Sequence, residues 1–192
     1  KIKFTILRKK GNRSIGRNSA IESSTGEVIL SSDVGCILDK NWVKMMINTF
    51  EKNTIDVVAG FYKGKADTDF QKALIPYVLV MPDKVNEKNF LPATRSMAFT
   101  KRIWKKAGGF PEEFSHNEDY VFAKKLKKIG AKIVFQKKAI VYWIPRNNLK
   151  STFVMFFRFA YGDAQSKILR PKVTFIFLRY QVVASLFFFS FM

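Results

Sequence analysis

The chain has 192 residues, of which 47% are hydrophobic, so it can form a folded domain with a sizeable core and is not a disordered polycation. Its 34 Lys and Arg against 15 Asp and Glu give a formal net charge of +19, which favours an anionic partner such as nucleic acid, a membrane surface or a phosphorylated substrate. One cysteine, Cys36, and one histidine, His116, exclude an internal disulfide, a cysteine-based zinc cluster and a multi-histidine metal site.

Strand-like and helix-like segments alternate from the first residue to Trp143. Short apolar or alternating runs predict strands at residues 1–7, 27–32, 55–60, 96–100 and 132–143. Helical spacing, capping residues and glycine stops predict helices at residues 14–24, 41–50, 70–80, 101–107 and 118–129. Pro76 is expected to kink or end the third of these helices. The order of the segments predicts an α/β fold with a mostly parallel sheet flanked by helices.

Asp33 directly follows the second predicted strand and precedes Val34-Gly35-Cys36. In open α/β sheets, ligands bind beyond the carboxyl ends of strands, where a carboxylate can hold a divalent cation against a diphosphate. The alternative is an ordinary turn aspartate, with Gly35 supplying a positive φ. Position alone leaves both interpretations open.

Glu118 and Asp119 lie in the first turn of a helix that Asn117 is expected to cap. A general base needs a carboxylate that is aimed into a cleft. Acids in a first turn also favour the helix dipole by roughly 0.3–1 kcal/mol, without any catalytic role. The neighbouring His116 is either a ligand or base, or a solvated loop residue.

Residues 11–18 form a glycine-containing turn that enters a helix. Its backbone amides, together with Arg13 and Arg17, are suited to cradle a phosphate. The alternative is a solvated helix start, because the segment is neither a P-loop nor a dinucleotide-binding fingerprint.

Arg95 and Ser96 lie in a polar loop after Pro92. There the arginine either binds phosphate or substrate, or lies free on the surface. Trp143 ends the last predicted strand and serves either packing or the stacking of a sugar.

The ordered series of motifs over residues 11–146 resembles glycosyltransferase family 2, whose members have the GT-A fold. The matching segments are Gly16-Arg17-Asn18, Gly26-Glu27, Ser32-Asp33-Val34-Gly35-Cys36, Asp39, Asn41-Trp42, Gly108-Gly109-Phe110-Pro111, Glu118-Asp119, Lys125-Leu126 and Gly130. Single pieces are weak, but their order and spacing make the series fairly specific. The resemblance implies an enzyme that transfers a sugar from a nucleotide-sugar to an acceptor hydroxyl, with inversion at the anomeric carbon.

The resemblance also implies roles for individual residues. Asp119 matches the general base, and Glu118 would position the acceptor or the helix. Asp33 matches the first aspartate of the D-x-D motif, which holds the diphosphate and a divalent cation, Mg²⁺ or Mn²⁺. The other residues implied on the donor side are Gly35, Arg17, Asn18 and Arg13. The residues expected on the acceptor side are Arg95, Ser96 and Trp143.

The sequence departs from the family pattern in three places. Gly35 stands where the second aspartate of D-x-D is usual, and Trp143 stands near the place where many relatives have a metal-binding histidine. Asp33 is therefore the only metal ligand that the resemblance implies. The N-terminal nucleotide-binding portion of the family is missing before Lys1, so we expect residues 1–148 to form a partial GT-A domain.

Residues 149–192 differ in composition from the rest of the chain. Ten of the 20 phenylalanines lie in residues 151–192, and residues 124–172 hold 13 Lys or Arg and one acid, a local net charge of +12. We expect an amphipathic helix beside a membrane, followed by an interfacial helix or the start of a transmembrane segment over Val173 to Met192. The alternative for this last run is a core helix. The positive-inside rule then places the domain on the cytoplasmic side.

The sequence thus predicts a membrane-associated, inverting glycosyltransferase that acts on a lipid-linked or cell-surface glycan. Its expected partners are a nucleotide-sugar donor, the glycan or lipid-linked acceptor and an anionic membrane surface, but not nucleic acid. One alternative is a non-catalytic, basic protein that binds a membrane surface or nucleic acid on a degenerate glycosyltransferase scaffold. Another is a sugar nucleotidyltransferase on a related fold. Basic residues are not interleaved with aromatic ones in an RNA-binding pattern, which weighs against nucleic acid.

Overall fold

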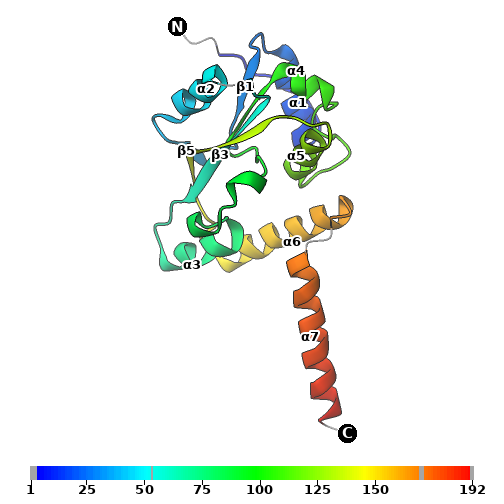
Figure 1. Ribbon diagram of the computed structural model, residues 1–192. Coiled ribbons are helices and arrows are strands. Elements are labelled where there is room, and N and C mark those ends of the chain that lie inside the picture. Colours follow the sequence, from blue (N-terminus) through cyan, green and yellow to red (C-terminus); the bar gives the residue numbers. More distant parts are fainter. Residues whose placement is uncertain (1–3, 53, 169–170, 191–192) are drawn as a thin grey trace.

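The structure is a computed structural model that describes residues 4–52, 54–168 and 171–190 (Figure 1). The helices are α1 (Arg13–Ser23), α2 (Trp42–Lys52), α3 (Asp69–Val78), α4 (Lys101–Lys106), α5 (Glu118–Lys128), α6 (Leu149–Gln165) and α7 (Pro171–Phe189). The strands are β1 (Val28–Ser31), β2 (Cys36–Leu38), β3 (Val57–Gly64), β4 (Met97–Thr100) and β5 (Ile133–Trp143). Two short 3₁₀ helices, η1 (Pro82–Lys84) and η2 (Glu87–Asn89), lie between α3 and β4.

The described strands form a mixed sheet in the order β1-β4-β3-β5-β2. β3 and β5 pair in parallel, whereas the β1–β4, β3–β4 and β2–β5 pairs are antiparallel. The prediction of a mostly parallel sheet is therefore wrong. Apolar alternation identifies a strand but carries no information on its direction. Here the excursion through α3 returns the chain as β4, antiparallel to β3.

The strand predictions fail at two short segments. β2 escapes the sequence pattern because it has three residues and exposes Ile37 and Leu38. It pairs with the end of β5, where Cys36 lies opposite Trp143. Residues 4–10 have no regular secondary structure, so the strand predicted at residues 1–7 is wrong for its last four residues, and residues 1–3 lie outside the described part of the chain.

The remaining predicted helices and strands are confirmed, with shifted ends. β3 continues past its predicted end to Gly64. α3 contains Pro76 and ends two residues later at Val78, which agrees with the expected stop, because proline has no N–H to donate to the carbonyl four residues earlier. Gly130 follows α5 with a φ of +72°, the left-handed conformation that its position as a helix stop requires.

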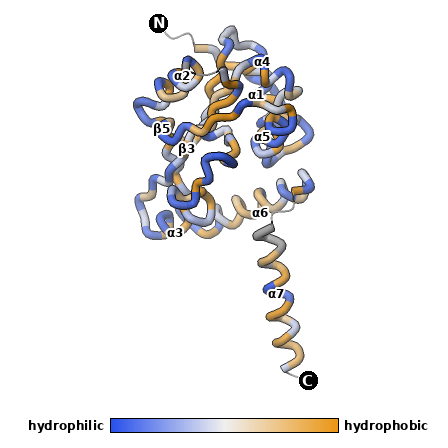
Figure 2. Tube along the Cα trace, viewed as in Figure 1, coloured by the Kyte–Doolittle hydropathy of each residue, from blue (hydrophilic) through white to orange (hydrophobic). Residues whose placement is uncertain are grey.

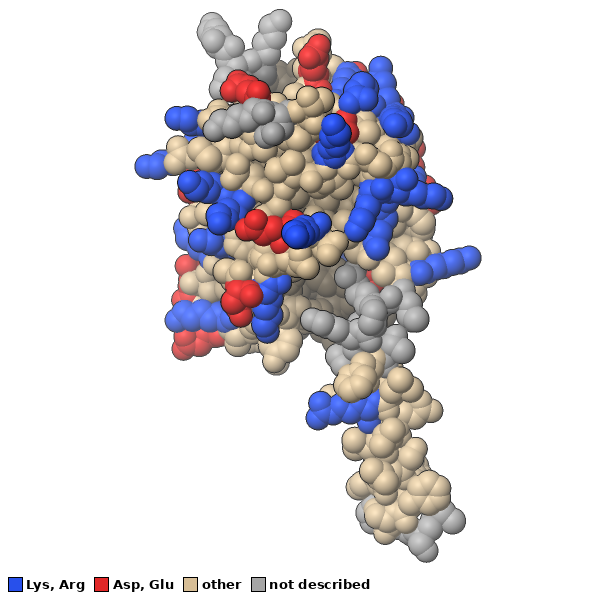
Figure 3. Space-filling view, viewed as in Figure 1, with Lys and Arg blue, Asp and Glu red and all other residues tan. Residues whose placement is uncertain are grey.

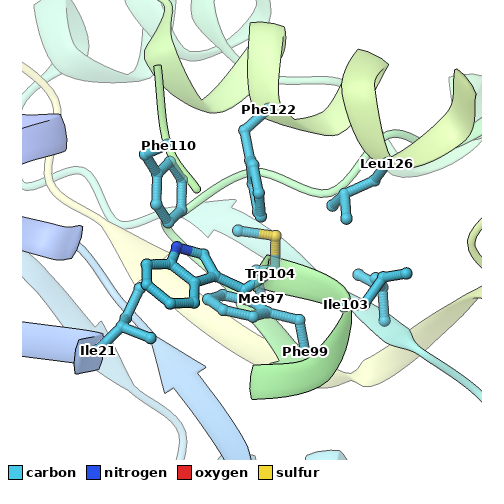
Figure 4. Close-up of a cluster of buried hydrophobic side chains, with 9 residues drawn as sticks. Ile21, Met97, Phe99, Ile103, Trp104, Phe110, Phe122 and Leu126 are labelled. Carbon is cyan, nitrogen blue, oxygen red and sulfur yellow. The ribbon is translucent and has the colours of Figure 1, made fainter. Parts of the chain in front are cut away.

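Alternating side chains of β4 divide the core into two layers. Met97 and Phe99 point to the face covered by α1, α4 and α5, and Ala98 points to the face covered by α2. The first layer is drawn in Figure 4 and consists of Ile21, Val57, Met97, Phe99, Ile103, Trp104, Phe110, Phe122 and Leu126. The second consists of Trp42, Met46, Val58, Ala98, Ala139 and Val141. Because Phe122 and Leu126 are fully buried in the first layer, α5 is fixed against the sheet.

The two C-terminal helices differ in their packing. α6 crosses beneath the sheet domain, and α7 extends away from it (Figure 1). α6 buries Thr152, Met155 and Gly162 against the domain. The described side chains of α7 from Phe175 onward are exposed, although most are apolar (Figure 2), so α7 is not a core helix. Within residues 4–52, 54–168 and 171–190, no helix is both long and apolar enough to span a membrane.

Gly60 tests the packing of the two layers around β3. A Cβ at this position would overlap Ser96 Oγ and lie 2.6 Å from Met46 Cε and 2.8 Å from the Ala139 carbonyl. We expect Gly60→Ala to lower the free energy of unfolding by about 1–3 kcal/mol, the usual cost of overpacking. The measurement is chemical denaturation.

The matched control is Gly16→Ala in α1, where a Cβ meets no atom within 4 Å. This change is expected to stabilise the protein by about 0.5–1 kcal/mol, because alanine loses less backbone entropy than glycine in a helix. Equal effects of the two substitutions would contradict the close approach at Gly60.

Candidate active site

Arg17, near the middle of α1, connects three separate parts of the chain. Its Nη2 donates to Asp33 Oδ1 at 2.8 Å and to Thr94 Oγ1 at 3.3 Å, and its Nη1 forms an ion pair with Glu118 Oε1. Arg13, one turn earlier, places its Nη1 3.9 Å from the same Glu118 oxygen. The structure therefore brings together four residues that the sequence predicted for one site, although Arg17 and Glu118 are 101 residues apart.

Asp33 lies in the tight turn between β1 and β2. Its carbonyl accepts a hydrogen bond from the Cys36 N–H at 3.3 Å, and Gly35 has a φ of +86°, as predicted. The Val34 side chain is fully exposed, and a Cβ at Gly35 would meet nothing within 4 Å. The turn thus leaves open space beside Gly35, two residues after Asp33, where a ligand can approach the backbone closely.

Glu118 and Asp119 are neighbours with different environments. The Glu118 side chain is 3% exposed and is paired with Arg17. Asp119 is half-buried, and its Oδ1 accepts the N–H of Tyr120 at 2.8 Å.

Burial raises the pKa of Asp119, and the negative charges of Glu118 and Asp33 raise it further, whereas Arg95 lowers it. A carboxylate in this environment accepts a proton at a higher pH than an ordinary aspartate.

The loop that precedes α5 is held by α6 rather than by a cap. Asn117 adopts a left-handed conformation with a φ of 59° and makes no side-chain hydrogen bond to α5, so the predicted side-chain cap is wrong. Its Nδ2 instead donates to Asp163 Oδ1 at 2.5 Å.

A second pair of contacts joins the same loop to α6. Gln165 Oε1 accepts from the backbone N–H and the hydroxyl of Ser115, and Gln165 Nε2 donates to the Glu113 carbonyl at 3.3 Å. Gly162 makes the close approach possible, because a Cβ there would lie 2.7 Å from the Cβ of His116. The position of Glu118 and Asp119 therefore depends on α6.

Arg95 directly follows Thr94, which accepts a hydrogen bond from Arg17, and it is held between two aromatic rings. Its guanidinium carbon lies 5.5 Å from the ring centroid of Tyr62 and 5.5 Å from that of Trp143. Such cation–π contacts hold the arginine in place while its charge still acts on Asp119. Trp143 is thus placed beside the site, as a support for Arg95.

The model for glycosyl transferase family 2 matches residues 1–107. The chain belongs to this family. No protein among those with curated descriptions matches the chain.

Two solved glycosyltransferase structures resemble the fold. S. aureus TarS in complex with UDP-GlcNAc superposes with a TM-score of 0.56 at 20% identity, over 77% of this chain and 43% of that one. The mannosyltransferase PcManGT from Pyrobaculum calidifontis, in complex with GDP-Man and Mn²⁺, superposes with a TM-score of 0.59 at 15% identity, over 82% of this chain and 43% of that one. The chain thus spans less than half the length of each relative, and the likeness supports a GT-A type of α/β fold with a mixed sheet.

Two residues predicted for the site, Asn18 and Ser96, instead form hydrogen bonds within the core of the domain. Asn18 is 7% exposed. Its Nδ2 donates to the Phe110 carbonyl and to Glu112 Oε1. Its Oδ1 accepts from the Phe110 N–H and from the Trp104 indole N–H. Ser96 is fully buried between the Trp42 indole and the Ala139 carbonyl. The structure therefore does not bring Asn18 or Ser96 to the cluster around Arg17, because their polar groups fasten the core.

The family resemblance implies a divalent cation at Asp33. Among the residues that the structure describes, no three His, Cys, Asp or Glu side chains come together as a possible metal site. Asp33 is paired with Arg17, and Gly35 has no side chain to offer. The donor set fits a cation that takes one carboxylate from the protein and its other ligands from phosphate oxygens and water, as Mg²⁺ commonly does.

Sequence reasoning missed several side chains that build the site. Thr94 is 1% exposed and accepts from Arg17, and Tyr62 lies on β3 beyond the predicted end of that strand. Asp163 and Gln165 act through contacts between distant parts of the chain, since Asn117 and Asp163 are 46 positions apart. The run Tyr161-Gly162-Asp163 was the available signal, because a glycine between polar residues in a helix marks a close approach.

The raised pKa of Asp119 predicts a cost to stability that depends on pH. Because the folded-state pKa lies above the unfolded-state value, stability is lost as the pH rises through the folded-state pKa. We expect Asp119→Asn, which mimics the protonated acid, to increase the free energy of unfolding at pH 7. The gain should vanish below the ordinary pKa of aspartic acid.

The matched control is Asp67→Asn, at an exposed position before α3, which should leave stability unchanged at both pH values. Denaturation curves at pH 7 and pH 3 decide the matter. A variant at position 119 that is less stable than the parent at pH 7 would show that Asp119 is ionised there without strain.

Proposed function

We propose that the complete protein transfers a sugar from a nucleotide-sugar to an acceptor hydroxyl, with inversion at the anomeric carbon and with Asp119 as the general base. The observation that carries this proposal is the environment of Asp119. It is a half-buried carboxylate with a raised pKa, beside the ion pairs that Arg17 makes with Asp33 and Glu118. Membership of glycosyl transferase family 2 supports the assignment.

In the proposed reaction, Asp119 takes the proton of the acceptor hydroxyl while that oxygen forms a bond to the anomeric carbon. The bond between this carbon and the diphosphate oxygen breaks on the opposite face. The products are the glycosylated acceptor, a nucleoside diphosphate and a protonated Asp119. The raised pKa of Asp119 makes it a stronger base than an ordinary aspartate.

Arg17 and Arg13 are placed to stabilise the departing diphosphate. Negative charge develops on its bridging oxygen as the bond breaks, and fixed cations in a part-buried site stabilise such charge without reorganising. Arg17 is held by Asp33, Thr94 and Glu118, so its guanidinium is already oriented before a donor arrives.

The proposed donor is a nucleoside diphospho-sugar. The structures of TarS with UDP-GlcNAc and of PcManGT with GDP-Man support this class. The Mn²⁺ in the PcManGT structure supports a divalent cation, with Asp33 as its protein ligand. When bound, a cation would neutralise charge on the diphosphate.

The proposed acceptor is a lipid-linked or cell-surface glycan, and the proposed location is the cytoplasmic side of an anionic membrane. Two observations support this. Large apolar side chains of α7 are exposed, among them Phe175, Phe177 and Phe188. Lys and Arg side chains dominate the charged surface of the domain in Figure 3, and residues 124–172 carry a local net charge of +12.

Asp119→Asn tests the base. In the complete protein we expect this change to reduce the turnover number by about 10²–10⁴-fold while donor binding is retained, because the amide cannot accept the proton. Asp67→Asn is the control and should keep full turnover. The rate of transfer is measured from the release of nucleoside diphosphate. The anomeric configuration of the product is determined from NMR coupling constants.

Unchanged turnover in the Asp119→Asn variant would overturn the assigned base, and a product with retained configuration would overturn inversion. A protein that binds neither UDP- nor GDP-sugars but binds nucleic acid would favour the non-catalytic alternative. Addition of a chelator tests whether a divalent cation is needed. Full activity in the presence of the chelator would contradict a role for Asp33 as a metal ligand.

Vesicle binding tests the membrane surface. The complete protein is expected to float with vesicles that contain phosphatidylglycerol and to float less with phosphatidylcholine alone, because the basic block needs an anionic surface. Phe177→Asp on α7 should reduce binding to the anionic vesicles, whereas Val43→Asp on α2, also an exposed apolar position on a helix, should not. Equal flotation of both variants would contradict a surface contact through α7.

A further inference from the structure

A pocket of about 440 Å³ lies where α6 meets the loop before α5. It is lined by His116, Phe153, Val154, Phe157, Arg158 and Tyr161. Apart from His116 and Arg158, these side chains are apolar or aromatic. The volume lies within the range of roughly 300–1,000 Å³ that is usual for small-molecule sites.

The aromatic walls of this pocket are left in contact with solvent. Phe153, Phe157 and Tyr161 are 72%, 62% and 52% exposed. The ring of Tyr161 lies edge-on to His116, with centroids 6.1 Å apart. A cluster of large apolar side chains on a hollowed surface is typical of a binding site for an apolar ligand.

One end of the pocket is cationic. Arg158 belongs to its lining. Partial burial and the positive charges of Arg13 and Arg158 lower the pKa of His116. An apolar pocket with positive charge at one end matches an amphiphile whose head group is anionic.

This cationic end adjoins the candidate active site. His116 is two residues before Glu118 in the chain, and Arg13 is 3.9 Å from the Glu118 carboxylate. Gly162 brings α6 so close that a Cβ on it would lie 2.7 Å from the Cβ of His116. A ligand in the pocket would thus have its charged end near the residues that begin α5.

We propose that this pocket binds the apolar chain of an amphiphilic acceptor, with the anionic head group held by Arg158. The assignment as an acceptor rests on the proposed transferase function, whereas the binding itself does not. A flat membrane surface is a different occupant, because it would contact the outermost side chains of α6 and α7 rather than fill a hollow beside His116.

The experiment is calorimetric titration of the complete protein with decyl phosphate, decanol and inorganic phosphate, each below any micelle-forming concentration. Decyl phosphate should bind at least about tenfold more tightly than either of the others, because only it uses both the apolar walls and the cationic end. Phe157→Ser should weaken decyl phosphate about tenfold or more. Arg158→Gln should bring its affinity down to that of decanol.

The control variant is Phe177→Ser on α7, an aromatic residue that is also exposed but lies outside the pocket. It should bind decyl phosphate like the parent. Circular dichroism confirms that each variant is folded.

Equal binding of decyl phosphate and inorganic phosphate, or equal binding by the Phe157→Ser variant and the parent, would overturn the pocket. So would a protein that binds only vesicles and no monomeric decyl phosphate, because the apolar face would then be a membrane contact. No nucleotide-sugar is present in this titration, so an absence of decyl phosphate binding can be distinguished from an absence of sugar transfer. Intact binding without any inhibition of transfer by decyl phosphate would overturn the acceptor assignment.

Discussion

The site depends on one cation, the guanidinium of Arg17, because three carboxylates converge where little water is available. Glu118 is almost completely buried, and a buried carboxylate without a partner costs several kcal/mol. Arg17 supplies that partner and binds Asp33 with its other nitrogen. α1 must therefore lie where it reaches both the turn after β1 and the start of α5. Asn18, the next residue, points to the other side of α1 and is bonded to Phe110. Of these two consecutive residues, Asn18 binds the helix to the core and Arg17 places its charge in the site.

The same arrangement explains why two adjacent acids differ. Arg17 and Arg13 are both close to Glu118, whereas Asp119 has Arg95 as its compensating charge and two negative neighbours, Glu118 and Asp33. Burial and repulsion raise the pKa of Asp119, and a carboxylate with a raised pKa is suited to accept a proton in acid–base catalysis. Ionisation of Asp119 is unfavourable in the folded state, so this residue lowers the stability of the protein at pH values where it is ionised.

Much of this fold could be predicted from sequence, and the failures have physical causes. Periodicity located most helices and strands, since it depends on local burial, but it could not give strand direction or find the three-residue strand β2. The order of motifs grouped Asp33, Arg17 and Glu118, and in the structure Arg17 forms ion pairs with both acids. Asn18 and Ser96 lie in the same motifs, yet their polar groups are used inside the core, which depends on packing partners far away in the chain. The expected cap at Asn117 failed for the same reason, because Asp163 competes for its side chain.

α6 combines two tasks that would otherwise belong to separate elements. Its outer side carries the exposed aromatic residues of the pocket, and its inner side holds the loop from Glu113 to Asn117 through Asp163 and Gln165. Because Gly162 allows no space between the helix and this loop, a displacement of α6 would move the residue that directly precedes Glu118. The helix α6 would therefore both contact an apolar ligand and help to orient the proposed base. A ligand bound to the outer side of α6 would thus contact the same helix that positions the loop before Asp119.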